Sequence, residues 1–391
     1  MAPPFSRAEY AGRLRAVQTR MREAGLDALF LTDPANVNWL CGFDAWSFYV
    51  PQALLVEASG DQPVWMGRLM DAGAARFTTY LDDAHVLALP EDYVQRPDIH
   101  PGDWMAERLI ERGLARAAIG YESDHYFLSP RWFAALGRGT PEARWIDADR
   151  LVNWARFVKS EAELAVMAEA AGIAGVAMRA AFDGLRPGIR QCDLMAEVVG
   201  AQIRGLPNAG GHLTAVYPLM LAGEKASTAH PMWDDSPLEA DQTVAFELGG
   251  CRSRYNAGLA RTVHIGRAPD RLIETAKAVE EGLEAVLAVL RAGVSAGEAH
   301  RAWRTVLDRR GLEKPSRIGY SIGVGYAPDW GERTVSLRPN DSTLLPENAV
   351  IHVMLGMWMD GWGMELSETV RIRTAGCEAL TNFPRAVFET G

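Results

Sequence analysis

Cysteine is scarce in this chain, and long apolar runs are absent from it. Only four of the 391 residues are cysteines, and they are widely spaced with no C-x-x-C pair: Cys41, Cys192, Cys251 and Cys377. That spacing argues against a disulfide framework or a zinc site and indicates reduced thiols in a cytosolic protein. No uninterrupted apolar run reaches the ~18 residues of a membrane span, because Arg179 interrupts the most apolar helical stretch, residues 172–182. We therefore expect no membrane partner.

Positive charge is also in short supply. Forty Lys and Arg residues stand against fifty Asp and Glu residues, the net charge is −10, and no basic stretch interrupts the acidic background. A nucleic-acid-binding protein needs clustered Lys and Arg side chains to neutralise phosphates, so we expect no nucleic-acid partner. The first six residues lack the charged-then-apolar layout of a signal peptide. The sequence therefore predicts a soluble, cytoplasmic globular protein.

The pattern of predicted elements divides the chain near residue 150. Ser6-Arg7-Ala8-Glu9 is a capping box, which starts a helix that ends at Gly25. Short apolar strands then alternate with helices, which predicts one α/β domain over residues 1–150. The predicted strands span residues 28–32, 53–57, 64–66, 85–89, 117–121 and 145–147, and the later helices span residues 101–113 and 129–137.

The second half has a different pattern. A long Ala-rich helix is predicted over residues 161–182 and a second helix over residues 191–205. Strands dominate residues 214–265, two more helices follow at residues 271–293 and 296–311, and strands near 349–358 and 365–373 close the chain. Residues 151–391 are therefore expected to form a second domain, which makes the fold class α+β.

Glu247 is the first candidate for chemistry. It lies in the strand segment Phe246-Glu247-Leu248-Gly249-Gly250. Strand alternation places Phe246 and Leu248 on one face and Glu247 on the other. A lone carboxylate in an apolar strand either faces solvent or is buried for a function, and the pattern alone leaves both interpretations open.

Three further ionisable residues are candidates. His230 follows a polar loop and precedes a proline, and a lone loop histidine is more often structural or exposed than catalytic. Glu365 and Glu368 lie in the last predicted strand pair with Ser367 between them. Because strand side chains alternate, Glu365 and Ser367 share a face and Glu368 lies opposite. At most one of the two carboxylates is therefore expected to face a given cavity.

Aromatic residues crowd two stretches, and glycines crowd a third. The aromatic positions are Trp39, Phe43, Trp46, Phe48 and Tyr49 in the first half, and Trp330, Trp358 and Trp362 in the second. Such density is typical of a core, and the alternative is a cage for a small cation. The segment 319–325 has three glycines but lacks the Lys and the spacing of a phosphate loop, so it does not predict nucleotide binding. Its glycines are expected to let two backbones approach closely.

The order of these segments resembles the creatinase–prolidase–methionine aminopeptidase superfamily, whose catalytic domain has the pita-bread fold. The resemblance rests on Arg156-Phe157-Val158-Lys159-Ser160 before the long helix, on Glu161 and Glu163 in its first turn, and on Arg261-Thr262. It covers nearly the whole chain. Residues 1–150 are similar to the N-terminal domain of creatinases and prolidases, and residues 151–391 are similar to the pita-bread catalytic domain.

The metal ligands of the peptidases in this superfamily are largely missing. Their five positions fall on Glu247, Gly258, Tyr320, Met354 and Ser367, the last of which becomes Glu368 after a shift of one residue. Gly and Met offer no hard oxygen ligand, and Tyr is a poor substitute for imidazole. A hydrolase that needs a metal-bound hydroxide cannot easily run on these residues. The resemblance therefore implies the metal-independent branch, with no metal and no cofactor.

Within that branch the chain is most similar to the ectoine hydrolases. His230-Pro231 falls where creatinase has its catalytic His, whereas Asn256 stands where we expect His in ectoine hydrolases. The segments that carry the similarity are Trp46–Val50, Phe246–Leu248 with Arg254 and Tyr255, Pro328–Glu332, and Gly356–Asp360 with Trp362 and Gly363.

The resemblance implies a hydrolase that opens the cyclic amidine of ectoine or hydroxyectoine to N-acetyl-2,4-diaminobutyrate. Glu247 would attack the carbon between the two ring nitrogens, or would act as a base on water. His230 would carry a proton to the leaving nitrogen, and Glu365 is the third catalytic residue. An Arg would hold the substrate carboxylate, and Arg254 and Arg333 stay equal candidates. The full set of implied substrate-binding residues is Trp46, Phe48, Tyr49, Arg254, Tyr255, Tyr320, Trp330, Arg333 and Glu368.

Other functions stay open at this point. The chain could be a creatinase-like amidinohydrolase, an Xaa-Pro peptidase with a degenerate metal site, or a binding module without activity. Retention of Glu247, His230 and Glu365 favours an enzyme, because a bare scaffold has no need of three ionisable groups there. The expected partner is a small-molecule substrate, and the resemblance implies a homodimer.

Overall fold

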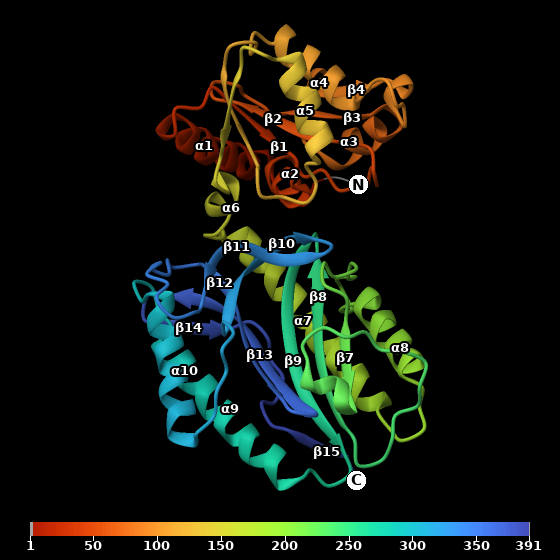
Figure 1. Cartoon of the computed structure of the whole chain (residues 1–391), viewed down its shortest axis with the longest axis vertical. Helices are drawn as coiled ribbons and strands as arrows, with labels where there is room; N and C mark the ends of the chain where they lie inside the picture. The colour runs from red at the N-terminus through yellow and green to blue at the C-terminus, as the bar shows by residue number, and fades with distance from the viewer. Residues whose placement is uncertain (1–2, 391) are drawn as a thin grey trace. The chain divides into compact units, whose positions relative to one another are not determined.

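The computed structural model describes residues 3–390, so the first two positions of the N-terminal stretch and the last residue lie outside it. The chain forms two compact units, which meet between Arg156 and Phe157 (Figure 1). The sequence pattern places the boundary earlier, at residue 150. Helix α6 (Leu151–Ala155) belongs to the first unit because it packs against α1 (Arg7–Glu23).

The first unit is built on a six-stranded sheet with the strand order β4-β3-β2-β1-β5-β6. The sheet is mixed, because β1 pairs with β2 antiparallel and with β5 parallel. All six strands predicted in this half are present: β1 (Ala28–Leu31), β2 (Ala53–Glu57), β3 (Val64–Arg68), β4 (Val86–Leu89), β5 (Ala118–Tyr121) and β6 (Arg144–Asp147). The remaining α-helices are α2 (Pro34–Cys41), α3 (Ala72–Thr78), α4 (Pro101–Glu111) and α5 (Pro130–Gly139).

Local capping explains where the helices of this unit begin. The Ser6 side chain accepts a hydrogen bond from the backbone of Glu9 at the start of α1, as the capping box predicts. Helix α2 was not predicted because it is only eight residues long. It has a start signal, however, since the Asp33 side chain accepts from the backbone of Ala35 and Pro34 occupies the first turn.

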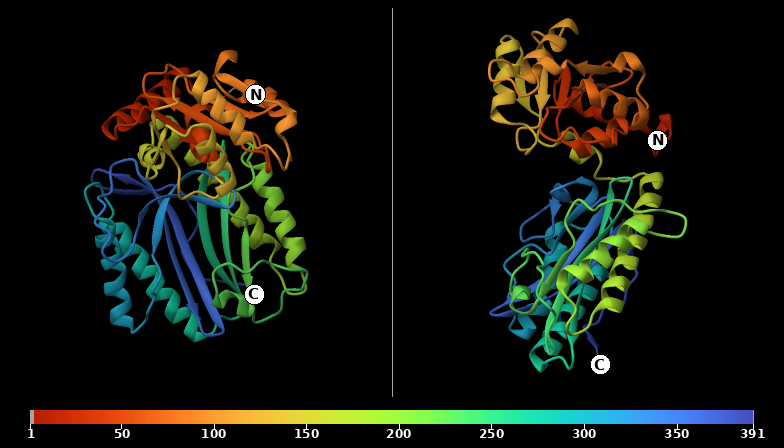
Figure 2. Two further views of the ribbon diagram at one scale, coloured as in Figure 1. Left: turned by 45° about the horizontal axis from the view of Figure 1, so that its top comes forward. Right: turned by 90° about the vertical axis from the view of Figure 1, so that its right-hand side faces the viewer.

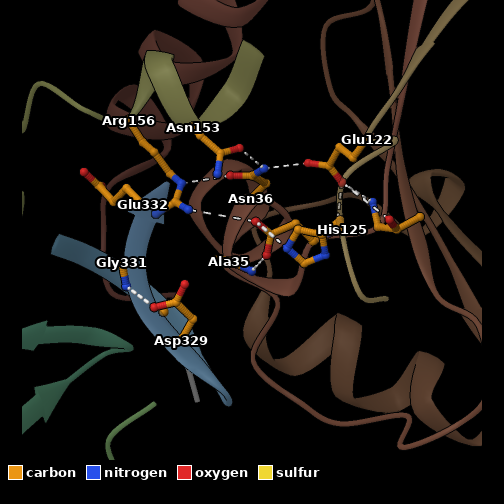
Figure 3. Close-up of polar contacts among 12 residues, drawn as sticks. Ala35, Asn36, Glu122, His125, Asn153, Arg156, Asp329, Gly331 and Glu332 are labelled. Carbon is orange, nitrogen blue, oxygen red and sulfur yellow. Dashed lines mark hydrogen bonds and ion pairs between the residues drawn. The ribbon is translucent and has the colours of Figure 1, made fainter. Parts of the chain in front are cut away.

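Buried amide and charged side chains tie the end of the first unit to its interior (Figure 3). The Asn36 amide on α2 donates to Glu122 Oε1 at 2.6 Å and to Asn153 Oδ1 at 2.9 Å. The Arg156 guanidinium donates to Asn36 Oδ1 at 2.8 Å. Buried polar groups are tolerated only when they are paired. This network therefore fixes the segment that leads out of the first unit.

The second unit is built on a nine-stranded sheet. Seven strands follow the order β14-β13-β12-β10-β9-β8-β7, while β11 pairs with β10 and β15 pairs with β9. The strands are β7 (Leu219–Ala222), β8 (Thr243–Arg252), β9 (Tyr255–Ile265), β10 (Gly319–Tyr326), β11 (Asp329–Ser336), β12 (Val350–Met359), β13 (Trp362–Arg373), β14 (Gly376–Ala379) and β15 (Phe388–Thr390). The α-helices are α7 (Glu161–Gly184), α8 (Gln191–Arg204), α9 (Asp270–Val289) and α10 (Ala296–Arg310). The predicted α+β class is confirmed.

Strands β10 and β11 were not predicted, because glycines conceal the alternation of β10. The predicted role of these glycines holds at Gly319, where an added Cβ atom would lie 2.6 Å from the backbone oxygen of His352. Only a residue without a side chain permits that approach between β10 and β12.

Helix α7 is the central helix of the second unit, and it lies along the outside of β8 and β9 (Figure 2). Within residues 3–390 it is also the one helix that could cross a membrane by length and composition alone. Packing accounts for this apolar character. Ala174, Ala177 and Met178 form a cluster with Phe246 and Leu248 in the core of the unit.

The sheet curls so that β13 lies against β9, although β12 and β10 separate them in the strand order. Hydroxyl side chains bridge the two strands. The backbone of Gly258 donates to Thr369 Oγ1 at 3.0 Å, and the backbone of Ala260 donates to Ser367 Oγ at 2.7 Å. Thr262 Oγ1 donates to the carbonyl of Glu365 at 3.0 Å. The curled sheet thereby brings β8, β9, β10, β12 and β13 around one interior face.

Candidate active site

Glu247 lies on the inner face of β8. It pairs with Ala260 of β9, so its side chain shares a face with that residue, while Phe246 and Leu248 point to the opposite face and into the core with α7. The predicted alternation is therefore confirmed, and the solvent-facing interpretation is wrong, because Glu247 is only 6% exposed. Burial raises the pKa of its carboxyl to about 7.

Glu365 on β13 is the second buried carboxyl on this face. It is 1% exposed, and its Oε1 accepts a hydrogen bond from the Trp358 indole at 3.2 Å. Its Oε2 is buried and has no hydrogen-bond partner among residues 3–390. Burial, and then the charge of Glu247, raise the pKa of Glu365 well above its ordinary value. A buried polar atom without a partner marks a place where a ligand can bind.

Tyr320 on β10 and Trp330 on β11 stand beside the carboxyl pair. The Trp330 indole donates to the Tyr320 hydroxyl at 2.9 Å. Burial, and then the charge of Glu247, raise the pKa of Tyr320 above its ordinary value, which places the phenol within electrostatic reach of that carboxyl. Trp330 also lies over Gly249 of β8, where a Cβ atom would come 2.6 Å from the indole ring. Both predicted residues thus belong to the same site as Glu247.

His352 on β12 is a site residue that sequence reasoning missed. Its ring nitrogens contact the Tyr320 hydroxyl at 3.2 Å and Ser367 Oγ at 2.8 Å. Burial lowers the pKa of His352 to about 3, so the ring is neutral. An added Cβ at Gly258 would lie 2.7 Å from this ring, so the absence of a side chain there makes room for the imidazole. The available signal was a lone histidine in an apolar strand, two residues before Met354.

Lys314 is a second residue that the sequence did not indicate. It is buried, with its ammonium 4.2 Å from the centre of the Trp358 ring. The ammonium donates to the carbonyl of Gly356 and to Ser316 Oγ, each at 2.8 Å. Burial lowers the pKa of Lys314 to about 8, although Glu365 opposes that shift. The site therefore has a cationic group near the Glu365 carboxyl, whose Oε2 has no hydrogen-bond partner among residues 3–390.

The residues at the former ligand positions do not fit a dinuclear metal site. Gly258 offers no donor atom, Met354 offers a thioether, and Ser367 and Tyr320 are already engaged by His352. Within residues 3–390, no three His, Cys, Asp or Glu side chains come together as a metal-binding group. We therefore assign no catalytic step to a metal ion.

The structure overturns the predicted substrate contacts of Tyr255 and Glu368. Tyr255 is on the opposite face of β9 from Gly258, and its hydroxyl donates to Glu163 on α7 at 2.7 Å. Glu368 is on the opposite face of β13 from Ser367 and forms a buried ion pair with Arg261 at 2.6 Å. Strand alternation turns both side chains away from Glu247. Their positions indicate structural roles.

His230 lies in the loop that follows β7, and it is exposed. The short helical turn before it, residues 223–227, packs against β13 and β8, which carry Glu365 and Glu247. Within residues 3–390, no hydrogen bond or ion pair joins His230 to either carboxyl. Its catalytic role stays a prediction.

The two candidate arginines occupy turns and irregular backbone. Arg254 and Arg333 both have positive φ angles, of 66° and 56°. The guanidinium of Arg254 lies over the Tyr326 ring at 5.0 Å. Asp329, on the same strand as Arg333, caps its own turn by accepting from the backbone of Gly331 at 2.7 Å (Figure 3). The role of either arginine toward a substrate carboxylate stays a prediction.

The aromatic stretch of the first unit divides into core and surface residues. Trp39 and Phe43 are buried, as the core interpretation predicts, whereas Phe48 is 86% exposed. Trp46, Phe48 and Tyr49 line a pocket of the first unit together with His100, Phe127 and Trp132. The core interpretation is therefore wrong for Phe48 and Tyr49, and the cation-cage interpretation stays a prediction.

Family models and curated relatives match almost the whole chain. The model of metallopeptidase family M24 matches residues 165–374, and that of the creatinase/prolidase N-terminal domain matches residues 13–158. The chain is 39% identical to an ectoine hydrolase of Halomonas elongata over 98% of both chains. It is 40% identical to an uncharacterized hydrolase/peptidase, y4tM, of Sinorhizobium fredii over 97% of both chains.

Solved structures of lower identity share the fold. The X-Pro aminopeptidase of Thermotoga maritima superposes with a TM-score of 0.81 at 21% identity, covering 97% of this chain and 99% of that one. The prolidase of Thermococcus sibiricus superposes with a TM-score of 0.84 at 15% identity, covering 97% of this chain and 99% of that one. These likenesses show the N-terminal domain and pita-bread architecture. The family matches and the ectoine hydrolase relative establish that the chain is a C–N bond hydrolase of metallopeptidase family M24 with a creatinase/prolidase N-terminal domain.

Proposed function

We propose that this chain opens the cyclic amidine ring of ectoine to an N-acetylated diaminobutyrate without a metal ion. The observation that carries the proposal is the buried carboxyl pair Glu247 and Glu365 at the centre of a degenerate metal site. The identity of 39% to an ectoine hydrolase supports the substrate. The Gly, Tyr, Met and Ser residues at the former ligand positions support chemistry without metal.

The two carboxyls suit opposite roles in proton transfer. Glu247 has a pKa of about 7, whereas Glu365 is raised well above its ordinary value. Glu247 is therefore the better candidate for the carboxylate, and Glu365 is the better candidate for the proton donor. Two carboxyl groups with separated pKa values are a recurrent arrangement for a base and an acid. The rate should rise with pH as Glu247 loses its proton, through about pH 7.

The reaction balances with these groups. The Glu247 carboxylate takes a proton from water while the water oxygen bonds to the amidine carbon, which becomes tetrahedral. The bond from that carbon to one ring nitrogen then breaks, and Glu365 or His230 supplies the proton that this nitrogen needs. In the covalent version, the Glu247 carboxylate itself bonds to the carbon, and the bond to one ring nitrogen breaks as Glu365 or His230 protonates that nitrogen. Water then cleaves the bond between Glu247 and the carbon, which frees the carboxyl and leaves the amide of the product.

Groups for binding the substrate surround the carboxyl pair. The rings of Trp358 and Tyr320 each have a cation over one face, Lys314 at 4.2 Å and Arg317 at 4.4 Å. The substrate amidinium would bind against their remaining aromatic surface, a contact that contributes about 0.5–2 kcal/mol each. Lys314 joins Arg254 and Arg333 as a candidate partner of the ring carboxylate, because its ammonium lies beside Trp358. Such a site selects a small molecule with a delocalised cation and a separate carboxylate.

A panel of substrates tests the proposal. Purified protein is incubated with ectoine, hydroxyectoine, creatine and an Xaa-Pro dipeptide, and products are identified by liquid chromatography and mass spectrometry. We expect N-acetyl-2,4-diaminobutyrate from ectoine. Exclusive release of urea from creatine, or of proline from the dipeptide, would replace the proposed substrate with that one.

A further inference from the structure

The neutral ring of His352 lies between the hydroxyl groups of Tyr320 and Ser367, and each tautomer of the ring donates to a different one of them. The ring carries one proton, on either Nδ1 or Nε2. Nδ1 faces the Tyr320 hydroxyl at 3.2 Å, and Nε2 faces Ser367 Oγ at 2.8 Å. Each hydroxyl already accepts one hydrogen bond, from Trp330 Nε1 at 2.9 Å and from the backbone of Ala260 at 2.7 Å. What is left to assign is the acceptor for the hydrogen of each hydroxyl.

A proton on Nε2 would leave the buried hydroxyl hydrogen of Ser367 without an acceptor. Ser367 Oγ would then accept two hydrogen bonds, and its own hydrogen would need another acceptor. Ser367 is 0% exposed, and no acceptor other than the imidazole is within hydrogen-bond distance among residues 3–390. A buried donor without an acceptor destabilises the state that contains it. Ser367 thus favours donation to Nε2, which leaves the proton on Nδ1.

With the proton on Nδ1, the hydroxyl hydrogen that lacks an acceptor in the protein is that of Tyr320. Tyr320 then accepts from both Trp330 and His352, so its hydrogen must go to a third group. Tyr320 is only partly buried, and its two partners, Trp330 and His352, lie over Gly249 and Gly258, a cross-strand pair on the same face of β8 and β9 as Glu247. The free hydrogen therefore faces the place where a molecule bound against Glu247 would lie.

We propose that Ser367 and His352 are positioning residues that fix the tautomer of the imidazole, so that Tyr320 donates its hydroxyl hydrogen to the molecule bound against Glu247. The role of Tyr320 toward substrate rests on the proposed function. The tautomer of His352 does not, because it follows from protein contacts alone. The acceptor on the ligand is the oxygen or nitrogen that gains electron density when the amidine carbon becomes tetrahedral. Gly258 contributes to this arrangement, because the absence of a side chain there makes room for the His352 ring.

The tautomer is measured directly on wild-type protein labelled with ¹⁵N histidine. Two-bond ¹H–¹⁵N correlation spectra distinguish the tautomers, and the His352 signals among the eight histidines are those that disappear in His352→Asn. We expect a neutral ring with its proton on Nδ1 between pH 5 and 8. A proton on Nε2, or a charged ring in that range, would overturn the proposal whether or not ectoine is a substrate.

Kinetics test the link from His352 to Tyr320. His352→Gln places its amide near Ser367 and removes the donor to Tyr320, so kcat for ectoine should fall about 10²-fold with little change in KM, as for a lost transition-state donor. His352→Asn restores a donor near the Nδ1 position and should recover at least about tenfold of that loss. In a Tyr320→Phe background, His352→Gln should cost nothing further. An equal loss in both backgrounds would show a purely structural role and refute the positioning claim.

Discussion

Replacement of Glu247 by Gln should stabilise the protein above neutral pH while it removes the activity. Burial raises the pKa of Glu247 from 4.5 to about 7, and one pKa unit corresponds to about 1.4 kcal/mol. The folded state therefore binds a proton between these pH values when the unfolded state does not. This contribution to the free energy of unfolding is complete below pH 4.5 and is lost as the pH rises to about 7. At pH 8 the free energy of unfolding of the wild type should be lower by about 3 kcal/mol for this reason.

Glu247→Gln keeps the side-chain volume but cannot ionise, so its free energy of unfolding does not fall in this way as the pH rises. At pH 8 its Tm should exceed that of the wild type by roughly 6–12 °C, since about 2–4 °C accompanies each kcal/mol in a domain of this size. The difference should vanish near pH 4.5. Thermal unfolding followed by circular dichroism at several pH values measures both. The matched control is Glu239→Gln, which makes the same chemical change at an exposed position.

The same variant should lose at least ~10³ in turnover of ectoine while it still binds substrate, as expected when a nucleophile or base is removed. Glu247→Asp should also fail by ~10², because shortening the side chain displaces the oxygen by about 1 Å. A Glu247→Gln protein that turns over at a near wild-type rate would remove this residue from the mechanism. A Tm below that of the wild type at every pH would refute the claim that ionisation of the buried Glu247 carboxyl destabilises the folded state.

Three other variants separate structural from functional residues. Phe48→Leu should leave the Tm unchanged because the ring is exposed, whereas a cation cage predicts about tenfold weaker ectoine binding by calorimetry. Glu368→Gln should lower the free energy of unfolding by about 3–5 kcal/mol, because it leaves the Arg261 charge buried without its partner; unchanged denaturant unfolding would refute this. Gly258→Ala should lower kcat more than it raises KM, because its Cβ displaces His352; wild-type kcat would show that the ring position is unimportant.

Local sequence patterns predicted the features that depend on one strand or one helix end. A capping box located the start of α1, and the Ala-rich pattern located α7. Period-two alternation put Glu247 on the face opposite Phe246, and it separated Ser367 from Glu368. Each of these inferences needs only neighbouring residues, which is why the structure agrees with it.

Residues that depend on pairing between strands were missed or misassigned. His352 gains its role from Gly258 on β9 and Tyr320 on β10, and no local pattern shows that these strands meet. Tyr255 was misassigned although a signal existed. The turn at Ser253 and Arg254 pairs Arg252 with Tyr255, and counting back along the hairpin places Tyr255 on the face opposite Glu247. The face of a strand that forms a site is therefore predictable only where its register is known.

Turnover of ectoine in the presence of a strong chelator tests the central claim most directly. The protein is dialysed against the chelator, its metal content is measured, and release of N-acetyl-2,4-diaminobutyrate is followed before and after addition of manganese or zinc. Because glycine, tyrosine, methionine and serine occupy four former ligand positions, we expect full activity at negligible metal content and no increase on metal addition. Loss of activity to the chelator, restored by either metal, would contradict it.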